Sequence, residues 1–409
     1  MTMKKNVLAL AVSGGLVAAP MAATAAPEVY GLIDIGVEHY TDSDDVGSDI
    51  FAGLQSPDGN SDERDFTLSN GMQSRVGFRG AEDLGVADLT ASYNLEFAVD
   101  VLSESGGGTD SALGTRLGWA ALGGDWGKIK VGSQWQALYE FGAWNTHRTD
   151  VHGYGSYYFT TGNLSNSQQF GFRQDSAISY EYGSAWGHSD PFAAQITLGI
   201  GEGSTSVGGQ FVDGGDLEDD ETTVQNEEGI TSLQAAFQYS FDKRFSVNAV
   251  FVQEFNDFDE SVVPGLNANR PADKDLDNLG GLNNEPSLYN VGARWSVTDA
   301  LELGANYTRV DLDNDSSDDT VDSIAVASFM DFGQGLSGHL GVAQASDDRD
   351  TEADLDLNVY GFVKKALSDR TSVRLEFEHG DYDDSVDSDG NSVTDGTATI
   401  ALLALQHNF

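Results

Sequence analysis

Hydrophobic and polar residues alternate with a period of two along most of this chain. In residues 28–40 the odd positions are mainly aliphatic, whereas the even positions include Glu28, Asp34 and Glu38. Such alternation is typical of a β-strand that has one face in an apolar environment and the other in a polar one. The pattern recurs along the chain and predicts sixteen strands, at 28–40, 71–80, 87–101, 112–123, 127–137, 170–183, 192–202, 230–242, 244–256, 286–297, 300–312, 321–333, 336–346, 355–365, 370–381 and 397–409.

The links between these segments alternate between short and long. Short links lie at 242–243, 298–299 and 333–335, and long ones at 41–70, 138–169, 203–229 and 257–285. Membrane barrels have short turns on the periplasmic side, long loops outside and an even number of strands. The sequence therefore predicts an all-β fold, a transmembrane antiparallel β-barrel of sixteen strands, in a single domain over residues 26–409.

The last predicted strand, 397–409, is apolar and ends on Phe409. An exposed apolar edge strand would invite aggregation, whereas a closed barrel has no edge. In lipid, closure is required because every unpaired backbone group costs several kcal/mol. We therefore expect the last strand to pair with the first. A secreted soluble β-protein is the alternative, and it leaves the sorted link lengths and the terminal Phe unexplained.

Residues 1–25 have the features of a cleaved secretory signal peptide. Lys4 and Lys5 precede an apolar stretch, and an A-x-A site occupies 23–25, so cleavage is expected after Ala25, with Ala26 as the alternative. The chain has no cysteine. An exported protein without disulfides must draw its stability from another source, and a hydrogen-bonded barrel in a bilayer is one such source.

Acidic residues outnumber basic ones by 66 to 21, which gives a net charge of −45. Nucleic-acid binding needs a basic face, so this class of partner is excluded. Acidic excess is typical of proteins adapted to high salt, where screening reduces self-repulsion, and a halophilic source is our hypothesis. The acidic stretches 311–315 and 387–391 have carboxylates spaced for divalent cations, but neither completes an EF-hand loop. We expect no cofactor beyond weak cation binding at these outer loops.

Several stretches together resemble the Gram-negative general diffusion porins, namely 29–34, 74–85, 115–123, 127–132, 172–180 and the terminal Phe409. The resemblance implies a homotrimer in the outer membrane, in contact with lipid and lipopolysaccharide. It implies passive diffusion of ions and small hydrophilic solutes through a water-filled pore that the third long loop narrows by folding inward. It also implies that the barrel-assembly machinery recognises Phe409.

A pore selects by its width and by the charged rings at its narrowest point. Arg75, Arg116 and Arg173 lie in porin-like stretches, and the resemblance gives them the basic half of a constriction. Alternation also places them toward the lumen. For Arg116 this assumes that its neighbours Thr115, Leu117 and Trp119 face lipid. An arginine in the lipid face would cost about 2–4 kcal/mol at mid-depth.

The acidic half of the constriction is expected in the link 138–169, which is the third long link when the shorter outer link 102–111 is counted. This third link begins Leu-Tyr-Glu-Phe-Gly, which resembles a Pro-Glu-Phe-Gly stretch of the family with Tyr139 in place of Pro. Glu140 is the first candidate for the acidic side and Asp150 the second. Further residues expected to line the lumen are Asp34, Glu38, Arg79 and Lys130.

No catalytic constellation is present in the sequence. The seven histidines are scattered, and neither H-E-x-x-H nor G-x-S-x-G occurs. We therefore expect no enzyme. A channel preferring a sugar or an acidic solute is the first alternative, and eighteen strands with an aromatic slide would mark it. An outer-membrane lipid hydrolase is the second, and it would need a His–Ser pair at lipid level. The sequence leaves open the sign of ion selectivity.

Overall fold

The computed structural model of the chain describes residues 27–42, 63–70, 74–102, 113–149, 173–186, 190–200, 204–207, 222–225, 229–255, 285–311, 320–347, 354–383, 385–386, 392–393 and 396–409. The predicted signal peptide and the candidate Asp150 lie outside these residues, as does most of the long links.

Each of the sixteen predicted segments overlaps a barrel strand. The barrel strands are β1 (Glu28–Asp42), β3 (Arg75–Asp83), β4 (Thr90–Val99), β5 (Leu113–Gly124), β6 (Gly127–Trp135), β7 (Arg173–Tyr182), β8 (Phe192–Ile200), β11 (Ile230–Ser240), β12 (Phe245–Glu254), β13 (Ser287–Thr298), β14 (Leu301–Asp311), β15 (Thr320–Gly333), β16 (Leu336–Asp347), β17 (Asp354–Ala366), β18 (Thr371–Asp383) and β21 (Gly396–Asn408). Two small hairpins lie within the long links: β9 (Ser204–Val207) with β10 (Thr222–Gln225), and β19 (Ser385–Val386) with β20 (Ser392–Val393).

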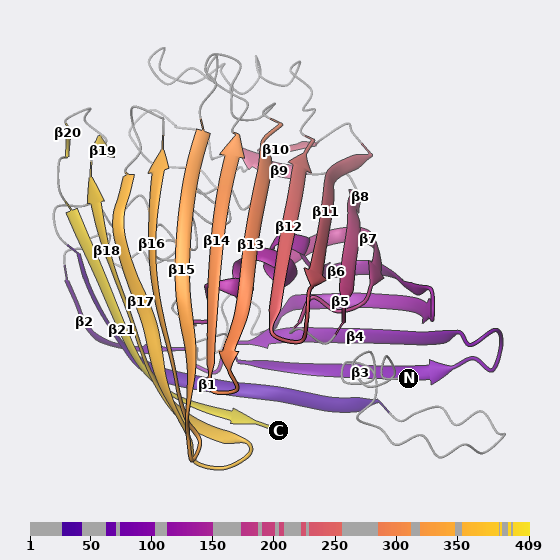
Figure 1. The fold of residues 1–409 in the computed structure, drawn as a ribbon, viewed down its shortest axis with the longest axis horizontal. Helices are drawn as coiled ribbons and strands as arrows, with labels where there is room; N and C mark the ends of the chain where they lie inside the picture. The colour runs from indigo at the N-terminus through magenta and orange to yellow at the C-terminus, as the bar shows by residue number, and fades with distance from the viewer. Residues whose placement is uncertain are drawn as a thin grey trace.

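The sheet closes on itself, and every strand pair in it is antiparallel (Figure 1). β21 pairs with β18 on one side and with β1 on the other, from Leu32 opposite Asn408 to Asp42 opposite Ala398. Beyond the ladder, Gly31 and Phe409 exchange two backbone hydrogen bonds of 3.1 Å. The predicted pairing of the first and last strands is therefore confirmed, and so is the barrel.

One barrel strand is interrupted. β2 (Glu63–Ser69) pairs with the second half of β1, whereas β3 pairs with its first five residues. The two share one position in the ring, so the seventeen strands of the sheet form a barrel of sixteen. At the break, the Ser74 hydroxyl accepts a 2.9 Å hydrogen bond from the Asp34 amide, and Asn70 accepts one from the Ser74 amide. These short polar side chains replace ladder bonds and end the strand.

The two faces of the barrel differ in the way that a lipid-facing barrel requires. On β18, Leu375 and Phe377 are 53% and 39% exposed, whereas Glu376 and Glu378 between them are 0% and 4% exposed. Carboxylates inside and apolar side chains outside are an arrangement that a bilayer stabilises and water does not. Among the described residues, no helix has the length and hydropathy to cross a membrane.

After β6 the chain turns into the lumen. A helical turn, η3 (Leu138–Gly142), is followed by a shorter one, η4 (Ala143–Asn145). These turns contact the inner faces of β11, β12, β13 and β14, on the far side of the ring from β3 and β4 (Figure 1). The described start of the third long link therefore crosses the interior of the barrel.

Candidate pore constriction

Three arginines from three strands gather on one side of the lumen. Nε of Arg116 on β5 lies 2.8 Å from Oε1 of Glu96 on β4. Nη1 of Arg75 on β3 lies 3.9 Å from the same oxygen. Arg173, the first residue of β7, is close enough to Arg116 for their charges to repel. The structure thus brings Arg75, Arg116 and Arg173 together, and we call them the arginine cluster.

Arg116 faces inward because of a β-bulge. In the ladder between β4 and β5, Glu96 lies opposite Leu117, and the next pair skips Arg116. Glu96 faces the lumen, so Leu117 does too, and it is 4% exposed. Trp119, two residues further, shares this face. The prediction that Leu117 and Trp119 face lipid is therefore wrong, because the extra residue shifts the alternation by one.

Aromatic side chains pack against the arginine cluster. Trp135, the last residue of β6, has the guanidinium carbons of Arg116 and Arg173 at 6.0 and 5.5 Å from its ring centroid. Tyr139 of η3 stacks on Trp135 with centroids 4.4 Å apart. Burial raises the pKa of Tyr139 to about 12, so the phenol stays neutral beside the arginines. Together with two further rings this forms the aromatic cluster: Trp135, Tyr139, Trp144 and Trp186.

Glu140 lies beside the lysines of β6. Lys128 and Lys130 both form ion pairs with Glu181, at 2.7 Å for Lys128. Their ammonium nitrogens are 5.5 and 5.4 Å from the ring of Trp119, which confirms that this ring is on the inner face. Burial raises the pKa of the Glu140 carboxyl above its ordinary value, and the charge of Lys130 acts in the opposite direction. Glu140 and Lys130 thus belong to one charged group on the β6–β7 wall.

The third long link is attached to the opposite wall through Asn145. Its Nδ2 donates to Oδ1 of Asn248 on β12 at 2.7 Å and to Oδ1 of Asn306 on β14 at 2.9 Å. Two glycines make room for it. A Cβ at Gly304 would collide with the Asn145 carbonyl, and one at Gly292 with the Asn145 amide nitrogen. We call this contact the asparagine clasp.

Two further contacts hold the residues after the clasp. Arg148 forms an ion pair with Glu302 on β14, and its guanidinium carbon lies 3.3 Å from the ring centroid of Phe329 on β15. His147 stacks on Tyr360 of β17 with centroids 4.7 Å apart. The described part of the link is therefore held at its first residues by the aromatic cluster. Its last residues are held by β12, β14, β15 and β17.

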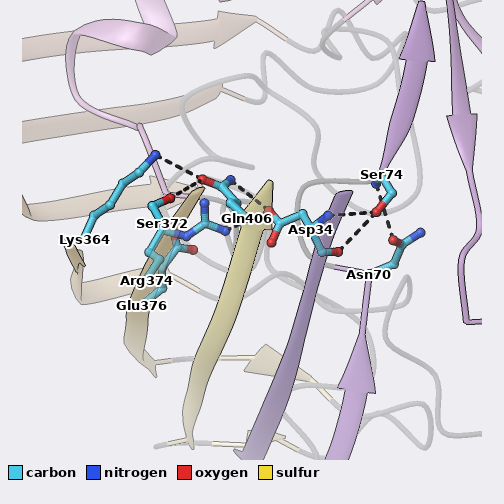
Figure 2. A network of polar contacts seen from close by, with 8 residues as sticks. All are labelled: Asp34, Asn70, Ser74, Lys364, Ser372, Arg374, Glu376 and Gln406. Atoms are coloured by element: carbon cyan, nitrogen blue, oxygen red, sulfur yellow. Dashed lines mark hydrogen bonds and ion pairs between the residues drawn. The ribbon is translucent and has the colours of Figure 1, made fainter. Parts of the chain in front are cut away.

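A third charged group, the seam network, lies where the first and last strands meet (Figure 2). Oδ2 of Asp34 accepts hydrogen bonds from Arg374 on β18 at 3.2 Å and from Gln406 on β21 at 2.9 Å. Nε of Arg374 lies 2.7 Å from Oε1 of Glu376. Lys364 on β17 donates to Oε1 of Gln406 at 3.0 Å. This seam network balances its own charges and ties four strands together.

The remaining sequence candidates are placed as follows. Arg79 lies on β3 nearer the turn to β4 than Arg75 does, and it pairs with Glu28 at 2.6 Å. Glu38 occupies an inward position of β1 and is 8% exposed. Asp150 lies outside the described residues. Within the part of the chain that the structure describes, no three His, Cys, Asp or Glu side chains are arranged to hold a metal ion.

Sequence reasoning overlooked the residues that hold the candidates in place. Glu96 has inward parity on a cleanly alternating strand, so it could have been found from that signal. Asn145 and Trp135 carry no such signal, because their partners lie in distant strands.

Comparison with known proteins decides the family. The family model described as Gram-negative porin matches residues 8–385. The chain belongs to this family. It is an outer-membrane channel protein of the porin class and not an enzyme, as the sequence predicted.

Curated relatives match a shorter stretch. Major outer membrane protein P.IB of Neisseria meningitidis serogroup A is 33% identical over 130 residues, 32% of this chain and 33% of the relative. The protein of the same name from Neisseria gonorrhoeae is 32% identical over 144 residues, 34% of this chain and 35% of the relative. The matched stretch thus spans about a third of the length of these relatives.

Solved structures agree in fold over almost the whole chain. An anion-selective porin from Comamonas acidovorans superposes with a TM-score of 0.64 at 16% identity, covering 94% of this chain and 99% of that one. OmpF of Salmonella typhi, solved with daunomycin, gives a TM-score of 0.56 at 17% identity over 94% and 97% of the two chains. At such identities the likeness supports the barrel fold alone.

Proposed function

We propose that the chain forms a water-filled channel for passive diffusion of ions and small hydrophilic solutes, and that its constriction lies between the arginine cluster and the third long link. The observation that carries the proposal is the lumenal placement of three arginines next to a link that crosses the barrel. We call this constriction the waist. Fixed charges at a narrow constriction of low dielectric constant act strongly on a passing ion.

The seam network and the charged group of Lys128, Lys130, Glu181 and Glu140 contribute less to selectivity. Arg374 lies between Asp34 and Glu376, and Lys128 and Lys130 share Glu181 with Glu140 nearby. In the arginine cluster, Glu96 pairs with both Arg75 and Arg116, and Arg173 lies close by. Because three guanidinium groups gather around this carboxylate, we propose that the waist favours anions.

Replacing Arg75 or Arg116 with glutamine tests this proposal. Each variant should shift the reversal potential in a salt gradient toward cations, because it removes one positive charge from the waist. Arg244→Gln is the matched control, since Arg244 lies in a short turn and its side chain is 58% exposed. Unchanged reversal potentials for both lumenal variants would refute the assignment of the constriction.

A channel that prefers certain solutes is the second candidate. The aromatic cluster favours it, because rings beside guanidinium groups can contact the apolar parts of a passing solute. A liposome-swelling series separates the two candidates. Rates that fall smoothly with solute size support diffusion, whereas saturation with one solute class supports preference.

We also propose that the chain assembles as a homotrimer, as its family suggests; one similar protein, OmpT of Vibrio cholerae, is described in a trimer form. Lipopolysaccharide and the barrel-assembly machinery are proposed partners on the same basis. Detergent-extracted protein should migrate as a trimer without heating and as a monomer after boiling. Migration as a monomer in both states would contradict the trimer.

A further inference from the structure

Glu96 occupies the centre of the arginine cluster. Its Oε1 contacts Nε of Arg116 at 2.8 Å and Nη1 of Arg75 at 3.9 Å. Its Oε2 accepts a 3.0 Å hydrogen bond from the hydroxyl of Tyr30 on β1. The residue is 6% exposed and comes from the barrel wall, so its position is fixed by both neighbouring strands.

Arg173 differs from the other two arginines. Among the ion pairs of the described residues, none includes Arg173, and the carboxylates of Glu96 and Asp175 act on it only at longer range. Its guanidinium group lies over Trp135, which carries no formal charge. Glu96 therefore interacts with all three guanidinium groups, and it is bound most closely to Arg116.

We propose that Glu96 is a specificity-determining residue that lowers the anion preference of the waist by neutralising part of the arginine cluster. The inference rests on the proposed function, because it assumes that the cluster lines the ion path. A fixed unit charge about 6 Å from that path in water changes the local concentration of a monovalent ion by about threefold. Removing the Glu96 charge therefore raises anion occupancy and lowers cation occupancy by about that factor.

Glu96→Gln is the direct test, because glutamine keeps the shape and one acceptor oxygen and removes the charge. In planar bilayers at low ionic strength, where screening is weak, the anion-to-cation permeability ratio should rise by about threefold or more. Tyr30→Phe is the matched control. It removes the hydrogen bond to Glu96 without changing any charge, and its permeability ratio should stay that of the wild type.

A second comparison keeps the test valid if Glu96→Gln fails to fold. The double variant Glu96→Gln/Arg116→Gln removes both charges of the closest ion pair, so neither is left without the other. It should be more anion-selective than Arg116→Gln alone and close to the wild type. Heat-modifiable migration in detergent identifies folded protein in each case.

The outcomes separate this inference from the proposed function. If Arg75→Gln and Arg116→Gln leave selectivity unchanged, the constriction itself is misassigned. If those variants shift toward cations while the removal of Glu96 gives no shift, or a shift toward cations, the inference about Glu96 alone is overturned. In the latter case Glu96 would serve to position the arginines.

Discussion

The asparagine clasp leads to a prediction about the third long link when its contact with β12 and β14 is weakened. Gly304 on β14 has no room for a side chain, because an added Cβ would collide with the carbonyl of Asn145. Gly304→Ala therefore forces Asn145 away from β14. Overpacking of a tight contact costs about 1–3 kcal/mol. Weakening the two hydrogen bonds of Asn145 to Asn248 and Asn306 adds about 1 kcal/mol each.

The total cost to the docked link is about 3–5 kcal/mol. We expect the link to leave the wall for a measurable fraction of time in Gly304→Ala. Single-channel recordings should then show a higher mean conductance with added open-channel noise. Limited proteolysis in detergent should cut the third link faster than it does in the wild type.

Gly118→Ala is the matched control. Gly118 also lies within a barrel strand, but the nearest atom to an added Cβ is a methyl group of Thr115 at 3.8 Å. This variant should keep wild-type conductance and protease resistance. If Gly304→Ala folds and is indistinguishable from Gly118→Ala in both assays, the clasp does not hold the link, and the reasoning fails.

Two further predictions concern stability. Asp34→Asn should lower the temperature of heat-modifiable unfolding, because it removes the carboxylate that accepts from Arg374 and Gln406. The buried groups left without this partner cost about 1–3 kcal/mol of folding free energy. Lys364→Gln, at the edge of the same network, should change the unfolding temperature much less. The net charge of −45 predicts that thermal stability rises with added salt, since screening reduces self-repulsion; a melting temperature independent of salt would contradict the halophilic hypothesis.

The strands could be predicted from the sequence because alternation is a local property. A residue such as Phe377 is apolar and its neighbours Glu376 and Glu378 are acidic wherever the strand lies in the ring. The pairing of β1 with β21 followed from one further requirement, that a membrane barrel has no edge. The break between β2 and β3 was not predicted, because Asn70 and Ser74 act through side-chain bonds that reach Asp34 on another strand.

Side-chain direction was predictable only where the ladder is regular. Arg75 and Lys130 face inward as alternation indicates. Arg116 also faces inward, but the reasoning assumed that Leu117 and Trp119 face outward, and the bulge opposite Glu96 reverses them. A bulge depends on the register of two strands, so a single strand's sequence does not reveal it. The same holds for Asn145, whose partners are 103 and 161 residues away.

The overall acidity of the chain does not decide what passes the waist. Asp42, at the end of β1, lies eight residues beyond Asp34, and this is about 26 Å along the strand at about 3.3 Å per residue. The Debye length is about 10 Å at 0.1 M salt, so acidic links beyond the strand ends are largely screened from the level of Asp34 and Arg75. At that salt we expect the balance between Glu96 and the three arginines to set the selectivity. At about 0.01 M the Debye length grows to about 30 Å, and the acidic links then add their field to that of the waist. The anion-to-cation permeability ratio should therefore fall as salt is lowered, by an amount that Arg116→Gln does not change.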